Sequence, residues 1–127
     1  MRITIAIIDH KHQRYETVGD WKWHPEWNDI LEVFVSDLGD KKMNACIVIH
    51  ELIEALLCRF NDPEITTEMV DEWDIDFLKT FPKEPEPGDC PDAPYHSQHK
   101  FASEIERAFA EKLGIVWNDY ERRIKEL

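Results

Sequence analysis

The sequence predicts a single α+β domain of 127 residues, in which a small antiparallel β-meander of three or four strands packs against a central helix and two or three further helices. Three observations predict this class. Residues 1–36 alternate between β-branched or aromatic residues and polar ones, residues 41–127 carry apolar stripes at helical spacing, and no linker separates the two parts. With 43% hydrophobic residues, the chain is long enough to bury one core.

The meander is expected within residues 1–36, where alternating apolar residues predict strands at 2–8, 14–18, around 21–23 and at 30–36. Gly19-Asp20 is typical of a tight turn between the second and third of these. Three tryptophans of this region could line a ligand groove, but packing under the sheet is the expected arrangement for Trp21, Trp23 and Trp27.

The helices are expected in the rest of the chain. Asp40 is a good N-cap for a helix over residues 41–60, and a second helix should cover residues 66–81. Residues 82–94 hold five of the seven prolines, which excludes regular structure and predicts either a mobile lid or a stiff loop on the surface. Residues 96–127 predict two C-terminal helices, with Gly114 ending the first.

Charge and composition restrict the setting of the protein. A net charge of −12 argues against nucleic-acid binding, which needs clustered lysine and arginine. No run approaches the eighteen or so apolar residues of a membrane span. Cys46 and Cys58 would lie roughly 18 Å apart on one helix, too far for a disulfide, so buried thiols and a cytoplasmic location are expected.

The chemistry of the chain is concentrated in residues 45–58, where all but three residues are apolar or small. The three exceptions are His50, Glu51 and Glu54. A helix that is apolar nearly all round belongs in a core, where ionisable groups need a partner or a metal. His50 and Glu54 are four residues apart and so lie on one helix face. The pattern His-Glu-x-x-Glu is a variant of the helical zinc-protease signature, which has a second histidine in place of Glu54.

A mononuclear zinc site needs three protein ligands and an open position. His50 and Glu54 supply two, and the third is expected to be His99, whose helix also carries Glu106 two turns further on the same side. Less favoured third ligands are His96, Asp71, Asp74 and Cys90. Asp71, Asp74 and Asp76 are otherwise expected to form a solvated face, or to orient a ligating histidine.

This site predicts a metal-dependent, peptidase-like hydrolase that acts on a peptide or small-molecule substrate. Glu51 would be the general base that takes a proton from the activated water. Zn²⁺ is the expected ion, with Mn²⁺, Mg²⁺ or Ca²⁺ as alternatives because a carboxylate replaces the second histidine. A strand edge near the motif helix could pair with an extended substrate.

Several segments also resemble a group of small uncharacterised proteins from phages and prophages. The similar segments are residues 49–55, Pro87-Gly88-Asp89, residues 92–95, His99 and Ile105-Glu106. The resemblance extends from about Asp37 to Tyr120. It implies a phage accessory protein in the cytoplasm of a bacterial host, without implying a mechanism. The resemblance to helical-motif zinc metalloproteases is narrower and covers only His50, Glu51 and the position of Glu54.

Three alternatives use the same residues differently. The cluster could be structural, with His50 as a hydrogen-bonded core histidine. The chain could instead be a non-enzymatic acidic phage protein that binds a basic host protein. The third alternative is a magnesium-dependent nucleotide pyrophosphohydrolase, an all-α class whose paired acidic motifs would correspond to Glu51, Glu54, Glu68 and Asp71.

Overall fold

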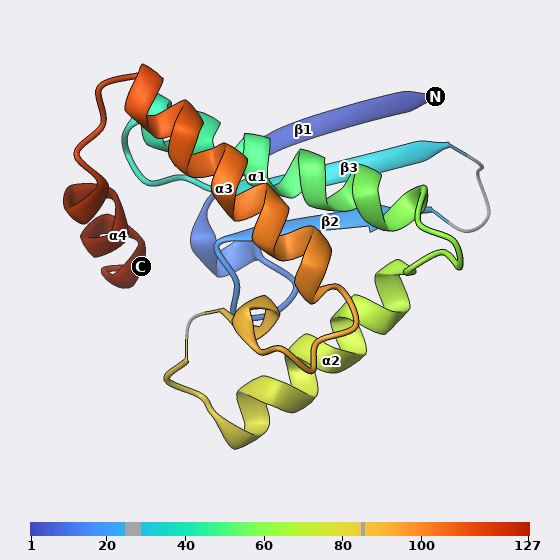
Figure 1. Cartoon of the computed structure of the whole chain (residues 1–127). Coiled ribbons are helices and arrows are strands. Elements are labelled where there is room, and N and C mark those ends of the chain that lie inside the picture. Colours follow the sequence, from blue (N-terminus) through green and yellow to red (C-terminus); the bar gives the residue numbers. More distant parts are fainter. Residues whose placement is uncertain (25–28, 85) are drawn as a thin grey trace.

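A computed structural model describes residues 1–24, 29–84 and 86–127, and it combines a three-stranded sheet with four α-helices over these residues (Figure 1). The predicted α+β class is confirmed. The strands are β1 (Arg2–Ile8), β2 (Gly19–Trp23) and β3 (Ile30–Ser36). The helices are α1 (Lys41–Arg59), α2 (Thr67–Thr80), α3 (His96–Lys112) and α4 (Trp117–Lys125), with short 3₁₀ turns η1 (His10–His12) and η2 (Pro87–Asp89). Among the described helices, none has the length and apolar character needed to cross a membrane.

The sheet is mixed, with the strand order β1-β3-β2. β3 lies in the centre, antiparallel to β2 and parallel to β1, so the expected antiparallel meander is wrong at β1. The segment 14–18 is not a strand, because its Arg14 and Tyr15 side chains reach out to acidic residues of α2. Alternation predicts that strands exist, but it does not determine which strands pair or in which direction.

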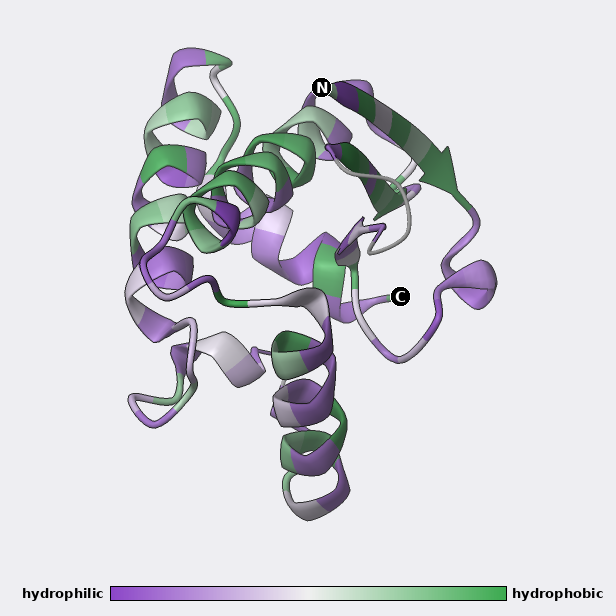
Figure 2. Cartoon of the chain, turned by 90° about the vertical axis from the view of Figure 1, so that its right-hand side faces the viewer, coloured by the Kyte–Doolittle hydropathy of each residue, from purple (hydrophilic) through white to green (hydrophobic). Residues whose placement is uncertain are grey.

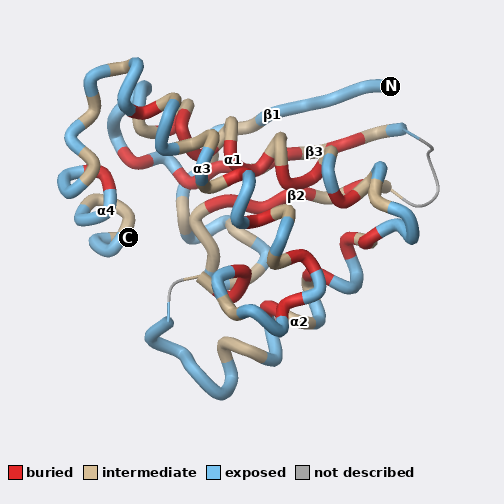
Figure 3. Tube along the Cα trace, in the orientation of Figure 1, coloured by how far each residue is buried: buried red, intermediate tan, exposed pale blue. Residues whose placement is uncertain are grey.

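The core lies between one sheet face and α1. Val33 and its neighbours on the inner face of β3 are fully buried, and the register places Trp21 and Trp23 on the same face. Packing of these two tryptophans under the sheet is confirmed, while Trp27 lies outside the described residues. Figure 3 shows this burial along β2, β3, α1 and α3, and Figure 2 shows hydrophobic residues along the strands and along α1.

Local signals fix the helix ends as expected. The Asp40 side chain accepts hydrogen bonds from the first amides of α1, and Thr66 caps α2 in the same way. Gly114 follows α3 with a positive φ of 73°, a conformation that glycine adopts without strain. Cys46 and Cys58 are buried free thiols, as predicted.

The proline-rich segment contributes a packed turn to the site. Pro87 and Gly88 of η2 are buried, and the Trp73 indole on α2 donates a hydrogen bond to the Pro87 carbonyl. α3 crosses over α1, and η2 lies against the N-terminal end of α3. α4 lies on the side of the molecule where α1 begins (Figure 1). The η2 part of the segment is thus a fixed wall of the region between α1 and α3.

Candidate metal centre

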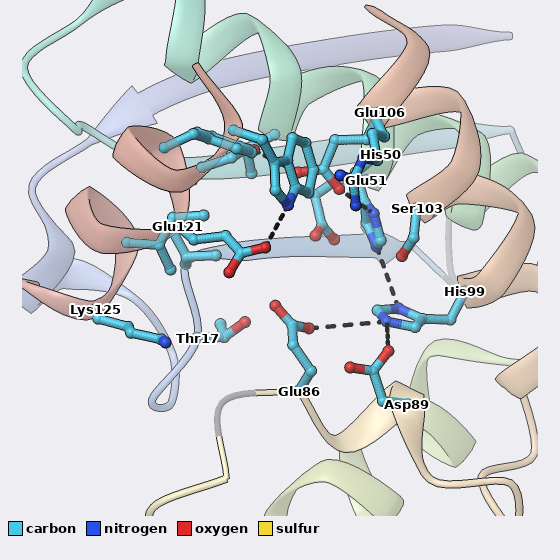
Figure 4. A pocket seen from close by; sticks show the side chains of 16 residues that line it. Thr17, His50, Glu51, Glu86, Asp89, His99, Ser103, Glu106, Glu121 and Lys125 are labelled. Carbon is cyan, nitrogen blue, oxygen red and sulfur yellow. Dashed lines mark hydrogen bonds and ion pairs between the residues drawn. The ribbon is translucent and has the colours of Figure 1, made fainter. Parts of the chain in front are cut away.

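Three of the residues singled out in the sequence converge at one point between α1 and α3. His50 Nε2 lies 3.1 Å from Glu54 Oε2 and 3.2 Å from His99 Nδ1, and Glu54 Oε2 lies 2.8 Å from His99 Nδ1. All three side chains are buried. Figure 4 shows the two imidazoles facing each other, with Glu51 beside His50. The third ligand named from the sequence, His99, is therefore in reach of the other two.

The spacing of these three atoms fits a small metal ion. A tetrahedral zinc ion with bonds of about 2.0 Å separates its ligand atoms by about 3.3 Å. The observed triangle has edges of 2.8, 3.1 and 3.2 Å, so one ion could contact all three atoms from one side after small adjustments. In the described part of the chain, only this group of histidine, cysteine and acidic residues meets the spacing needed to hold a metal ion.

A second layer of residues orients both histidines. The Nδ1 of His50 lies 2.8 Å from a Glu106 carboxylate oxygen, and the Nε2 of His99 lies 3.0 Å from Asp89. In each histidine the nitrogen that points away from the centre is therefore held by a carboxylate, which leaves the other nitrogen directed inward. Carboxylate–histidine pairs of this kind fix the tautomer and ring orientation of metal-ligating histidines in proteins.

The carboxylate of Glu54 is oriented too. The indole Nε1–H of Trp21 donates to Glu54 Oε1 at 2.9 Å, which leaves Oε2 for the centre. Glu106 is itself fixed, because the Tyr120 hydroxyl donates to its second oxygen. The three candidate ligands are thus held from β2, α3, α4 and η2.

Two glycines make room for the site. A Cβ at Gly19 would lie 2.5 Å from Glu51 Oε1, and a Cβ at Gly88 would lie 2.6 Å from the His99 ring. Real Cβ atoms do not approach neighbours this closely, so any other residue would displace these side chains. Both glycines are therefore required by close approach of the site residues to the backbone.

The electrostatics of the centre favour protonated histidines when no metal is bound. Burial by itself lowers the pKa of His99, but hydrogen bonds to Asp89 and Glu54 outweigh this effect and raise the pKa to about 10. The pKa of His50 is likewise raised well above its usual range, against burial, by Glu106 and Glu54. Burial favours protonation of Glu54, but hydrogen bonds from the two histidines lower the pKa of Glu54 to about 2.

Two N–H donors then point at the same Glu54 oxygen while their nitrogens lie only 3.2 Å apart. A divalent ion would replace both protons and bring its own two positive charges to the same place. The donor set of two imidazole nitrogens and one carboxylate oxygen suits zinc, which takes both ligand types.

Glu51 differs from the other buried polar residues of the site. It is only 8% exposed, and within the described residues its carboxylate has no hydrogen bond or ion pair. Burial and the neighbouring charge of Glu54 raise the pKa of Glu51 well above its usual range. Among the described residues the only fully enclosed polar side-chain atom without a partner is Gln13 Oε1, so the Glu51 oxygens face the adjoining cavities, where a water molecule can hydrogen-bond them.

Glu51 and all three candidate ligands line a cavity of about 30 Å³. That volume exceeds the roughly 10–15 Å³ that one water molecule needs. A larger cleft of about 420 Å³ adjoins it, a volume within the usual range for small-molecule sites. His50, Glu51 and His99 line both spaces, and the cleft is completed by side chains of α1, α3, α4 and the segments around Thr17 and Glu86 (Figure 4).

The less favoured ligands lie elsewhere. His96 bonds through Nδ1 to the Gly88 carbonyl, and Cys90 is a half-buried free thiol outside the cluster. Asp71 is bound to Arg14, and Asp74 accepts hydrogen bonds from two tyrosine hydroxyls. The solvated face predicted for the acidic residues of α2 is wrong for Asp74, which is buried. Neither Asp71 nor Asp74 hydrogen-bonds a ligating histidine, so the predicted orienting role falls to Glu106 and Asp89.

The geometry does not favour two other expectations. Glu68 is exposed in the first turn of α2 and lines neither cavity beside Glu51, so the acidic set of the pyrophosphohydrolase alternative is not assembled. The strand edge next to α1 belongs to β2, where the Gly19 carbonyl accepts from Thr17 and the Trp23 amide donates to Thr67. Side chains already occupy these groups, which an extended substrate would need.

Four orienting residues were not identified from the sequence as parts of a site. These are Trp21, Asp89, Glu106 and Tyr120: the sequence favours packing under the sheet for Trp21, and Asp89 and Tyr120 enter only through the resemblance to phage proteins. Glu106 did carry a signal, because it lies seven residues after His99 on the same helix face. Comparisons with family models, curated proteins and solved structures give no match for this chain.

Proposed function

We propose that the chain is a metal-dependent hydrolase in which His50, Glu54 and His99 hold the ion and Glu51 is the general base. The observation that carries this proposal is the state of Glu51. It is a buried carboxylate without a hydrogen-bond donor, beside a water-sized cavity lined by the three convergent ligands. A general base needs a carboxylate oxygen that no protein donor occupies and that a water molecule can reach, and Glu51 meets both conditions.

A bound divalent ion supplies a water of lowered pKa and a Lewis acid for the substrate carbonyl. The protein residues transfer the proton and orient the ligands. Glu51 accepts a proton from the water in the small cavity and passes it to the leaving group. The raised pKa of Glu51 brings its titration closer to neutral pH, which suits both steps. Glu106 and Asp89 accept hydrogen bonds from the outward nitrogens of His50 and His99, which directs the inward nitrogen of each ring at the position where the ion would bind.

Zinc is the ion best supported by the donor set, and Mn²⁺ is the next choice. Mg²⁺ and Ca²⁺ prefer oxygen ligands, so two histidines disfavour them. The adjoining cleft has apolar residues on its α1 and α4 walls, including Ile47, Trp117 and Ile124. This lining suits a peptide side chain or a small molecule of similar size.

The setting is proposed on separate grounds. The resemblance to small phage and prophage proteins supports a phage accessory protein, and three free cysteines support the reducing cytoplasm of a bacterial host. A non-enzymatic acidic protein that binds a host partner would need neither an unpaired buried Glu51 nor a cleft beside it.

The test is metal content together with hydrolysis. Protein purified without added metal should contain one equivalent of zinc or manganese by elemental analysis, and His50→Ala should lose it. His10→Ala is the matched control, because His10 bonds to Ser36 and Glu16 away from the cluster. Metal-loaded protein should hydrolyse members of a fluorogenic peptide library and lose this activity with a chelator. Equal metal content in wild type and His50→Ala would refute the metal centre.

A further inference from the structure

The outer edge of β1 has no partner in the described structure. β1 pairs with β3 on one side only and is the last strand of the sheet on that side. Soluble proteins usually protect such an edge with proline, inward charges, a bulge or a covering segment. The seven residues of β1 contain no proline and only one charged residue, Arg2. This edge therefore exposes unpaired backbone N–H and C=O groups to which another strand could hydrogen-bond.

The backbone pattern shows which groups are unpaired. The Arg2 amide donates to the Asp29 carbonyl, and the Ile8 carbonyl accepts from the Asp37 amide, so the even-numbered residues of β1 face β3. Because successive residues of a strand alternate in direction, the amides and carbonyls of Ile3, Ile5 and Ile7 point outward.

The side chains of the same three residues form an exposed apolar row. Ile3, Ile5 and Ile7 are 40%, 46% and 44% exposed. The register pairs these three isoleucines with Leu31, Val33 and Val35 of β3. The isoleucines therefore lie on the same sheet face as these buried residues, which is the face that packs on α1. Figure 3 shows β1 as the exposed strand of the sheet, next to the buried β3.

We infer that two copies of this chain associate through antiparallel pairing of β1 with β1, centred on Ile5. In this register Ile5 lies opposite Ile5 of the second copy, and Ile3 lies opposite Ile7. These are hydrogen-bonded pairs, since the amides and carbonyls of all three residues face outward, and each such pair exchanges two hydrogen bonds. Every outward group of the three isoleucines is then satisfied, and the apolar rows meet on one face of a continuous sheet.

The local charge at this edge allows a second copy to approach and sets the direction in which it pairs. Two molecules of net charge −12 repel each other over most of their surfaces, but residues 2–8 contain no acidic residue. Antiparallel pairing places Arg2 at the end of the partner strand near its Asp9, whereas parallel pairing would bring the two Arg2 side chains together. The proposed dimer is independent of the metal centre and can be tested without it.

The first test is the molar mass in solution. At about 100 μM, light scattering after size exclusion should give twice the 15.1 kDa mass of one chain, falling on dilution because a two-strand contact is smaller than a typical obligate interface. Ile5→Lys should be monomeric. Ile75→Lys is the matched control, because Ile75 on α2 is 41% exposed and should keep the wild-type mass when changed. A monomeric wild type, or a dimeric Ile5→Lys, would overturn the proposal.

Cross-linking tests the register even if Ile5→Lys folds poorly. In a Cys90→Ser background, Ile5→Cys should cross-link to itself with a short reagent, because paired Cα atoms lie about 5.5 Å apart. Ile3→Cys alone should not, since two copies of residue 3 would be about 14 Å apart along the strands. Mixing Ile3→Cys with Ile7→Cys should restore the cross-link. Self-cross-linking of Ile3→Cys would indicate parallel pairing and contradict the proposed dimer.

Discussion

Two polar clusters contribute side chains to the small cavity, and they differ in how completely they are paired. On one side the Arg14 guanidinium contacts both Asp20 and Asp71 through two hydrogen bonds each. Next to it, the hydroxyls of Tyr15 and Tyr95 both donate to Asp74. In this closed network every donor has an acceptor and every carboxylate accepts hydrogen bonds, as expected for a structural network.

The other cluster, formed by His50, Glu51, Glu54 and His99, is open. Two histidine nitrogens and one carboxylate oxygen converge within 3.2 Å, and Glu51 has no donor among the described residues. The first network thus has a partner for each of its polar side chains, whereas in the second Glu51 has none among the described residues. The difference indicates that completeness of pairing, more than burial or a shifted pKa, distinguishes a candidate site from a structural network.

The largest expected effect is on catalysis by the open cluster. Glu51→Gln should reduce hydrolysis about 10²- to 10⁴-fold while leaving the metal content unchanged, because it removes only the proton acceptor. Elemental analysis and initial rates on the same preparation measure both. Glu68→Gln, which changes an exposed glutamate of α2, is the matched control. Loss of metal together with activity would instead make Glu51 a ligand.

Breaking the closed network should affect stability and not the metal. Asp74→Ala leaves the hydroxyls of the half-buried Tyr15 and the buried Tyr95 without an acceptor and should lower the free energy of unfolding by about 2–5 kcal/mol. Urea denaturation measures this, and the metal content should stay at one equivalent. Asp76→Ala, on the exposed side of the same helix, should change stability by less than about 0.5 kcal/mol. A selective loss of metal in Asp74→Ala would contradict the assigned separation of roles.

A smaller effect is expected from the residues that orient the ligands. Glu106→Gln should weaken metal binding about 10- to 100-fold, because a neutral amide holds the His50 ring less firmly than a carboxylate does. Competition with a chelator of known affinity measures the change. Tyr120→Phe removes only the hydrogen bond to Glu106 and should weaken binding less. If Tyr120→Phe weakened metal binding more than Glu106→Gln does, the loss of affinity could not be due to the orientation of His50 by Glu106.

The smallest effect is a pH dependence of stability in the metal-free protein, which should run opposite to the pH dependence of metal affinity. The pKa of His99 is raised to about 10 in the metal-free fold, so its stabilising effect is complete below pH 6.5 and is lost as the pH rises toward 10. Metal-free protein should therefore lose stability over this range, and His99→Asn should lose less. Metal affinity should increase over the same range, because binding displaces histidine protons. Metal-free stability that rises with pH, relative to His99→Asn, would contradict the cluster's protonation.

The sequence by itself determined the local features of this protein. Helical spacing places His50 and Glu54 on one face of α1, Asp40 and Thr66 begin their helices, and alternation marks β1 and β3 as strands. These features depend on contacts between residues a few positions apart, which periodicity and capping preferences report directly.

Only the tertiary structure decided the rest. Alternation could not show that β1 pairs in parallel with β3, which leaves its edge open, or that residues 14–18 leave the sheet to bind α2. The sequence suggested His99 as a partner, but the 45 residues between Glu54 and His99 could place it anywhere until the packing of α3 on α1 brought it within 2.8 Å. The orientation of the ligands by Trp21, Asp89 and Glu106 likewise follows from contacts between distant segments, which no local pattern encodes.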